Sequence, residues 1–464
     1  MRKAVSDRSL ALHVQTMEYI KGDLSIFYER VGMHNLKKET LKPSDHVLWY
    51  LQRPVTKQLR ENISVDVAIV GGGMAGISAA QAFARRGKKV ALFEQYFCGS
   101  GATGKSSGFI TPNAELSCSD FAARFGDTAA QEIWNKFYDG IGLIESNIKD
   151  YGLSCGYRKQ DSFMIASTPK ANAYFRTEYE QLIKLGYKAS IYDAHATRSL
   201  IDSDGYFGGL MYYDTFGLDG YAYVQAMKHQ LESAGVGVYE ESPVQGIFEH
   251  VLQLPHAQVT ADYIVVCVDR FLPNLGLFDD ELFQAQNFIL ASQQLTQEQI
   301  TKIFPDRPLM VWDSELIYNY FRLTYDNRLI LGGGDLWSTF VDRESYGHDS
   351  IVKKLQHYFK CKFPELDLQF EYRWAGLIGI SKDIAPLIGA DCKDPYRYYI
   401  AACAGLPIAA ALGTYSAASL LDGERSMEQY FSIYRSFPIG GWLQKMMGKR
   451  LSFALSNALN QNIV

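Results

Sequence analysis

The sequence has 464 residues, of which 47% are hydrophobic and 21% are charged, and its formal net charge is −5. A chain of this length can bury the cores of two or three domains, and its slightly acidic balance argues against nucleic acid as a partner. The seven cysteines are dispersed and form no C-x-x-C pair. This pattern argues against a zinc site or a redox dithiol and predicts a reducing, cytoplasmic location.

Residues 1–62 precede the first clear strand and are predicted to form an N-terminal arm. Within this arm, residues 15–31 carry apolar side chains at the spacing of one helical face, and residues 41–54 look extended. We expect the arm to pack on the domain that follows it. An extension that binds a partner is the alternative.

The stretch 65–94 carries the most specific motif of the chain. A β-branched run suited to a buried parallel strand ends at Val70, and Gly71, Gly73 and Gly76 follow with the spacing G-x-G-x-x-G. A helix and a second apolar strand come next, and Glu94 closes the unit where an acid can bind ribose hydroxyls. Strand, turn, helix, strand and acid in this order predict a dinucleotide site at the helix N-terminus.

The sequence GSGATGKSSG at 99–108 forms a loop rich in glycine and hydroxyl groups. Such a loop can surround phosphates with its backbone N–H groups, whereas a solvated linker is the simpler alternative. Its position directly after the dinucleotide motif favours contact with the cofactor.

The rest of the chain alternates between two kinds of segment. Helices are predicted at 120–150, 221–234 and 343–360, short strands at 236–239, 244–248 and 262–268, and a hairpin at 318–323 and 328–331. We therefore predict an α/β fold in which a Rossmann-like nucleotide domain is interleaved with a strand-rich α+β substrate domain. The nucleotide domain is assigned to 63–115, 205–270 and 371–436, and the substrate domain to 116–204 and 271–370.

Two later segments raise the question of a membrane. Residues 398–421 carry no charge, but Gly405 and Pro407 interrupt them, so a buried strand, a turn and a helix are predicted instead of a span. Residues 437–464 are predicted to form a C-terminal helix. Packing on the cofactor domain is favoured over an interfacial helix, because its basic content is small and membrane contact is therefore not expected.

Four motifs give the chain a family resemblance: VAIVGGGMAGISAA, GSGATGKSSGF, YNYFRLTYDNRLILGGG and YRWAGLIGISKDIAPLIG. With them the chain resembles the FAD-dependent oxidoreductases of the D-amino-acid-oxidase superfamily, in particular the branch around γ-glutamylputrescine oxidases. The resemblance implies one FAD in an extended pose. The implied cofactor contacts are Gly71, Gly73, Met74, Ala75 and Gly76 at the pyrophosphate, Glu94 and Gln95 at the adenosine ribose, Val244 at the adenine, Gly101, Ala102, Thr103, Ser106, Ser107 and Gly108 along the cofactor, and Gly405, Leu406 and Pro407 at the pyrimidine edge of the flavin.

The resemblance also implies the chemistry. A small amine or amino acid would lose hydride from its C–N bond to flavin N5, and the resulting imine would hydrolyse. Arg322 lies near the place where family members clamp a substrate carboxylate, although a structural arginine is an equal alternative. Tyr318 and Tyr320 would line the pocket or belong to the core.

Three departures from the family pattern leave two other functions open. Pro407 lacks an N–H donor, Val268 adds bulk near the cofactor, and residues 271–301 contain no lysine that could assist oxygen. The alternatives are a flavin-binding homologue without turnover and a dehydrogenase that passes electrons to a quinone or carrier. No metal motif is found, and the oligomeric state cannot be inferred from the sequence.

Overall fold

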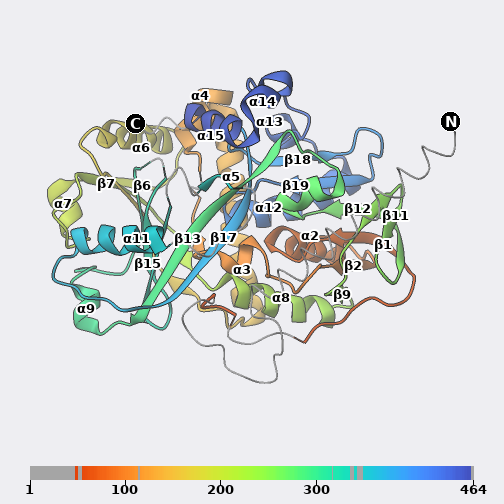
Figure 1. Ribbon diagram of the computed structural model, residues 1–464, viewed down its shortest axis with the longest axis horizontal. Coiled ribbons are helices and arrows are strands. Elements are labelled where there is room, and N and C mark those ends of the chain that lie inside the picture. Colours follow the sequence, from red (N-terminus) through yellow and green to blue (C-terminus); the bar gives the residue numbers. More distant parts are fainter. Residues whose placement is uncertain are drawn as a thin grey trace.

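The computed structural model describes residues 47–50, 55–112, 115–315, 317–334, 339–341 and 349–460. The helix predicted at 15–31 lies outside these residues, and only 47–50 of the arm segment 41–54 are described. Within the described residues, the chain forms two eight-stranded sheets and a three-stranded sheet (Figure 1).

The first sheet is a parallel, Rossmann-like sheet. Its central strand β1 (Ile63–Val70) pairs in parallel with β2 (Val90–Phe93) on one side and with β12 (Gln258–Val266) on the other. Outside these lie β9 (Gly237–Tyr239) beside β2 and β19 (Arg397–Ala401) beside β12, both parallel. Three antiparallel strands extend this sheet: β10 (Gly246–Phe248), β11 (Val251–Gln253) and β18 (Leu387–Ala390).

The second sheet has the order β17-β13-β16-β15-β14-β5-β7-β6. Its longest strands, β13 (Leu282–Gln294) and β17 (Phe370–Ser381), run antiparallel through the centre of Figure 1. The other strands are β5 (Ser162–Ile165), β6 (Ala189–Asp193), β7 (Gly208–Tyr212), β14 (Met310–Asp313), β15 (Tyr320–Leu323) and β16 (Arg328–Gly333). A small sheet of β3 (Phe109–Ile110), β4 (Arg158–Lys159) and β8 (Phe216–Gly217) lies outside both.

The helices follow the same division. With the first sheet go α2 (Met74–Arg85), α8 (Gly220–Ser233) and α12 (Leu406–Asp422), and the long α5 (Asp127–Tyr151) packs against α12. The remaining helices are α3 (Ala102–Lys105), α4 (Cys118–Phe125), α6 (Ala171–Lys184), α7 (Ala194–Arg198), α9 (Gln297–Thr301), α11 (Asp349–Lys362), α13 (Glu428–Phe431), α14 (Gly441–Met447), α15 (Lys449–Asn460) and the 3₁₀ helix η2 (Asp269–Leu275).

Most of the predicted helices and strands are confirmed, but two strands lie outside the nucleotide domain to which the sequence assigned them. The strands β7 and β17 belong to the second sheet, because β7 pairs with β5 and β6, and β17 pairs with β13. The prediction that these stretches belong to the nucleotide domain was therefore wrong. Hydrophobic pattern alone identifies a strand but does not say which partner it will pair with.

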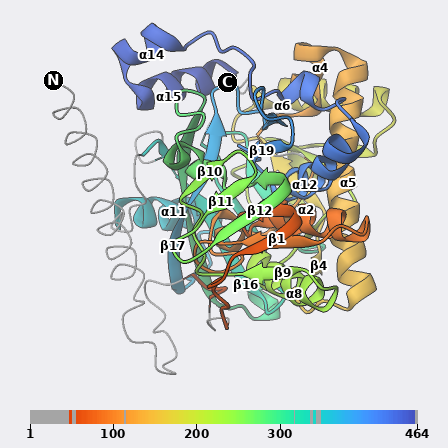
Figure 2. The same ribbon diagram turned by 90° about the vertical axis from the view of Figure 1, so that its right-hand side faces the viewer.

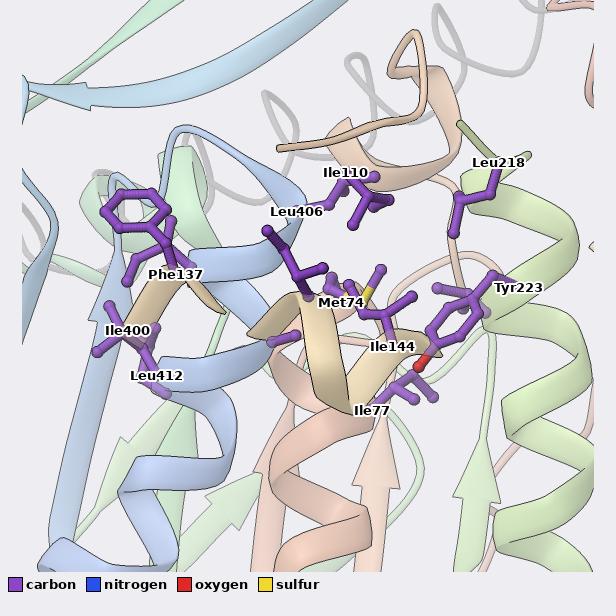
Figure 3. Close-up of a cluster of buried hydrophobic side chains, with 14 of the residues drawn as sticks. Met74, Ile77, Ile110, Phe137, Ile144, Leu218, Tyr223, Ile400, Leu406 and Leu412 are labelled. Carbon is purple, nitrogen blue, oxygen red and sulfur yellow. The ribbon is translucent and has the colours of Figure 1, made fainter. Parts of the chain in front are cut away.

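A core of three helices supports the cofactor side of the molecule. Met74 and Ile77 of α2, Ile144 of α5 and Leu406 and Leu412 of α12 converge in one buried cluster (Figure 3). The helices approach closely where glycines replace side chains. A Cβ on Gly413 would overlap the Ala75 carbonyl oxygen, and a Cβ on Gly140 would overlap the Pro407 carbonyl oxygen.

The two segments that raised the membrane question have different outcomes. Residues 398–421 form β19, a turn and α12, as predicted, with β19 and most of α12 buried. The C-terminal segment forms two helices instead of one, because Gly448 at φ +82° separates α14 from α15. These helices lie together near the top of Figure 2, and Trp442 and Leu459 are exposed there. No helix among the described residues is long and apolar enough to cross a membrane.

Two glycines of α5 provide a matched test of the helix packing. Gly140→Ala should lower stability by about 2 kcal/mol, because the methyl group meets backbone that cannot move aside. Gly142 faces open space in the same helix, so Gly142→Ala should raise stability by about 0.5–1 kcal/mol through helix propensity. Thermal unfolding of both variants checks this expectation. Equal melting temperatures would contradict the tight contact between α5 and α12.

Candidate functional site

A cavity of about 380 Å³ opens where the two large sheets meet. Of the sequence-predicted cofactor residues, sixteen line it: Gly71, Gly73, Met74, Ala75, Glu94, Gln95, Gly101, Ala102, Thr103, Ser106, Ser107, Gly108, Val244, Gly405, Leu406 and Pro407. Tyr318 and Tyr320 line it as well, whereas Gly76 and Arg322 do not. Glu94 and Val244 belong to the first sheet and its connections, and the two tyrosines belong to the second sheet side. The cavity therefore runs from one sheet to the other.

The three glycines of the nucleotide motif have different roles. Gly71 has φ +107°, and a Cβ there would lie 2.6 Å from the Cys267 carbonyl oxygen, so the turn requires glycine. A Cβ on Gly76 would overlap the Gly71 carbonyl oxygen, which makes Gly76 a packing residue that never reaches the cavity. At Gly73 a Cβ would meet only Thr103 Oγ1, at 3.4 Å. Gly73 therefore leaves open space at the start of α2, where a pyrophosphate fits.

Glu94 lies at the carboxyl end of β2 and is almost fully buried. Its carboxylate accepts hydrogen bonds from the Gly72 N–H at 2.8 Å and the Tyr96 N–H at 3.0 Å. Burial raises the pKa of Glu94, and these two N–H groups oppose the shift. The acid is thus held at the edge of the cavity, in the position where a ribose would approach.

The loop 99–108 is fixed by hydrogen bonds to three consecutive carbonyl oxygens. Trp374 Nε1 donates to Lys105 O at 2.9 Å, Trp49 Nε1 to Ser106 O at 3.1 Å, and Arg322 Nε to Ser107 O at 2.5 Å. We call these three donors, Trp49, Arg322 and Trp374, the carbonyl clamp. Because the clamp occupies these oxygens, they are not left free to repel an anion in the cavity.

Arg322 was predicted either to clamp a substrate carboxylate or to be structural, and its contacts favour the structural role. The side chain is buried, with 1% of its surface exposed, and its other two nitrogens donate to Leu323 O at 2.9 Å and Leu218 O at 2.6 Å. Burial lowers the pKa of Arg322 to about 9, and Asp219 opposes this shift, so the guanidinium stays charged near neutral pH. Arg322 does not line the cavity, and each of its three guanidinium nitrogens donates to a backbone carbonyl, which favours the structural alternative over the substrate clamp.

A second residue joins the two sheets at the cavity. Asp269 follows the end of β12 and accepts hydrogen bonds from Gly379 N–H of β17 at 2.6 Å and from Ala402 N–H, after β19, at 2.9 Å. Asp269 has φ +48° and Ala402 has φ +52°, so the backbone is in the left-handed region at both positions. Strain of this kind persists only where surrounding contacts hold it, and here the carboxylate supplies two of them.

The start of α12 forms the cavity wall at 405–407. Gly405 has φ +116°, Leu406 is the first helical residue and Pro407 is the second. Pro407 removes one N–H donor from this helix start, as the sequence predicted, but proline is well tolerated in a first turn. Nearby, burial raises the pKa of Cys403 well above its usual range, which disfavours the thiolate that a covalent flavin link through this residue would need.

Several cavity residues were missed by the sequence reasoning. Lys105, Glu115, Asn287 and Trp312 all line the cavity. Lys105 belongs to the predicted cofactor loop, so its neighbours could have indicated it. Glu115 follows the same loop closely, but nothing in its local pattern separates it from a surface acid. Asn287 and Trp312 arrive from distant strands, and no local signal marks them.

The contacts described above fit an extended dinucleotide. Gly73 and Gly101 leave space at the cavity wall, since a Cβ on Gly101 would meet no atom within 4 Å. The first turn of α2 carries no acidic residue that would repel a phosphate. Glu94 at one end and the aromatic strand β15 at the other match an adenosine end and a substrate end.

Comparison with known proteins gives the family. A family model described as FAD dependent oxidoreductase matches residues 66–418, and the chain belongs to this family. FAD is thus the cofactor, and the protein is an enzyme of the oxidoreductase class.

Relatives and solved structures agree with this assignment. Gamma-glutamylputrescine oxidoreductase of Escherichia coli is 26% identical over 394 residues, which cover 82% of this chain and 89% of that protein. The probable oxidoreductase OrdL of Haemophilus influenzae is 24% identical over 345 residues, 72% of this chain and 77% of that protein. The fold is similar to glycine oxidase from Geobacillus kaustophilus, with a TM-score of 0.70 at 18% identity, covering 81% of this chain and 99% of that chain.

Gly73→Val tests the pyrophosphate site. Gly73 has φ −85°, so valine is allowed by the backbone, and the folded chain should keep its melting temperature without cofactor. The added side chain would occupy the open space and weaken FAD binding by roughly 10- to 100-fold. Titration of the cofactor-free protein with FAD measures this. Unchanged FAD affinity would place the pyrophosphate elsewhere.

Arg322→Met tests the structural role of the arginine. Losing hydrogen bonds to three buried carbonyls should lower stability by about 3 kcal/mol, whereas Arg307→Met, at an exposed site, should change it little. Any loss of activity should be equal for substrates with and without a carboxylate. A rise in KM confined to carboxylate substrates would show that Arg322 binds substrate after all.

Proposed function

We propose that this protein oxidises a carbon–nitrogen bond of a small amine or amino acid with FAD as the electron acceptor. One observation carries the proposal: the cofactor cavity ends against an aromatic wall, which Trp312, Tyr318 and Tyr320 on the side of the second sheet form together with Phe109 of the small sheet. The names of the relatives support the substrate class, because gamma-glutamylputrescine oxidoreductase and glycine oxidase both act on amino compounds.

The aromatic wall has a definite geometry. The Phe109 ring meets the Tyr320 ring edge to face at 5.7 Å and the Trp312 ring edge to face at 6.4 Å. Trp312 and Tyr320 are buried and Phe109 is partly buried, so the rings exclude water and favour the uncharged form of an amine over its ammonium form. When bound, FAD accepts the hydride equivalent lost from the carbon next to nitrogen, and water hydrolyses the imine that remains. The protein needs no nucleophile of its own; its residues bind, orient and desolvate the substrate.

An anaerobic reduction experiment tests this function. The FAD-loaded protein is mixed without oxygen with a panel of primary amines, N-methyl amino acids and α-amino acids, and flavin absorbance is followed. At least one member should bleach the flavin, and a carbonyl product should appear in equal amount. The Gly73→Val protein, which is expected to hold little FAD, serves as the control.

Other outcomes would distinguish the alternatives. Bleaching by hydroxy acids or polyols alone would contradict C–N oxidation. A flavin that stays oxidised with every compound would support a homologue without turnover. After bleaching, fast recovery in air indicates an oxidase, and recovery only with an added dye or quinone indicates a dehydrogenase.

A further inference from the structure

A second cavity, of about 80 Å³, adjoins the substrate end of the first one. The two cavities share Glu115, Asn287, Tyr318 and Ile378 among their lining residues. The second cavity extends from them toward α15, between side chains that are mostly apolar. Among the residues that line the second cavity, Glu115 at the junction is the one charged residue, so it sets the electrostatics of this space.

Glu115 is that charged group. Its Oε1 accepts a hydrogen bond from the Tyr318 hydroxyl at 3.0 Å, and this is its one hydrogen bond to a described residue. No lysine or arginine of the described chain lies within ion-pair distance of its carboxylate. Burial raises the pKa of Glu115, and the Tyr318 hydroxyl opposes the shift. A desolvated carboxylate without a cation costs free energy, which a cationic ligand would offset.

The second cavity also contains polar atoms without partners. Thr339 Oγ1 and Asn287 Oδ1 are buried and make no hydrogen bond to any described residue, and both residues line this cavity. Thr339 has 8% of its surface exposed. Buried polar atoms of this kind are normally hydrogen-bonded, so their presence here indicates a ligand with polar groups beyond Glu115.

The nearby Arg322 already donates hydrogen bonds to backbone carbonyls. With that guanidinium bound to backbone oxygens, a substrate carboxylate near β15 gains no partner from Arg322 and meets Glu115 instead. Like charges repel, whereas an ammonium would form a charge-assisted hydrogen bond.

We propose that Glu115 binds an ammonium group of the substrate, and that the preferred substrate is a diamine, free or N-substituted, whose second nitrogen is cationic. The amine to be oxidised lies against the aromatic wall, the cationic nitrogen lies at the cavity junction, and any substituent enters the second cavity. This inference rests on the proposed amine oxidation and narrows its substrate class from amines and amino acids to diamines.

Three compounds of one chain length test the inference: putrescine, butylamine and γ-aminobutyrate. With the FAD-loaded protein, kcat/KM should be about 10- to 100-fold higher for putrescine than for butylamine, and lowest for γ-aminobutyrate. In Glu115→Gln the ratio of putrescine to butylamine should fall to within about threefold of one. Glu180→Gln, an exposed glutamate on α6, should keep the wild-type ratio.

Binding measured by calorimetry separates this inference from the proposed function. If amines reduce the flavin but putrescine shows no advantage in the wild-type protein, the Glu115 inference is overturned and the proposed function stands. If putrescine binds in a Glu115-dependent way but no amine reduces the flavin, the proposed function fails and the cation site stands. Neither binding nor reduction would overturn both. The comparison of putrescine with butylamine in the wild-type protein tests the inference even if Glu115→Gln does not fold.

Discussion

The cofactor site depends on the carbonyl clamp. Glycine-rich loops bind anions through N–H groups, which requires their carbonyl oxygens to find partners elsewhere. Here Trp49, Trp374 and Arg322 supply those partners for three consecutive residues of the loop 99–108. The donors come from the N-terminal arm and from the second sheet. The loop is therefore joined to residues 47–50 and to the second sheet, and contacts far away in the sequence hold it in place.

The boundary between the two sheets is also held by hydrogen bonds between a side chain and the backbone. Asp269 holds β17 and the segment after β19 together with one carboxylate, at the cost of left-handed backbone at its own position and at Ala402. At the start of α12, Gly140 lets α5 lie against the Pro407 carbonyl. These contacts hold β17, the segment after β19 and the start of α12, all of which line the cavity. They also show why the departure at Pro407 is compatible with an ordered site.

Sequence alone predicted the parts of the site that are local in the chain. The turn at 71–76, Glu94 and the loop 99–108 follow one another within one supersecondary unit, so spacing is enough to identify them. The roles of Arg322 and Glu115 could not be predicted, because each depends on what long-range folding brings to it. The backbone carbonyls of 107 and 218 occupy Arg322, and Tyr318, about two hundred positions away, marks Glu115 as a cavity residue. The assignment of β7 and β17 failed for the same reason, since strand partners are a tertiary property.

The proposed substrate preference depends on two side chains. Arg322 donates its hydrogen bonds to backbone carbonyls at the glycine-rich loop, and Glu115 presents a carboxylate to both cavities. A crystal structure of the FAD-loaded protein with bound putrescine, prepared without oxygen, tests this most directly. The account predicts an ammonium nitrogen within hydrogen-bond distance of Glu115, with Arg322 still bound to the carbonyls of Ser107 and Leu218. An Arg322 side chain released from those carbonyls and turned into the cavity, with Glu115 away from the ligand, would contradict it.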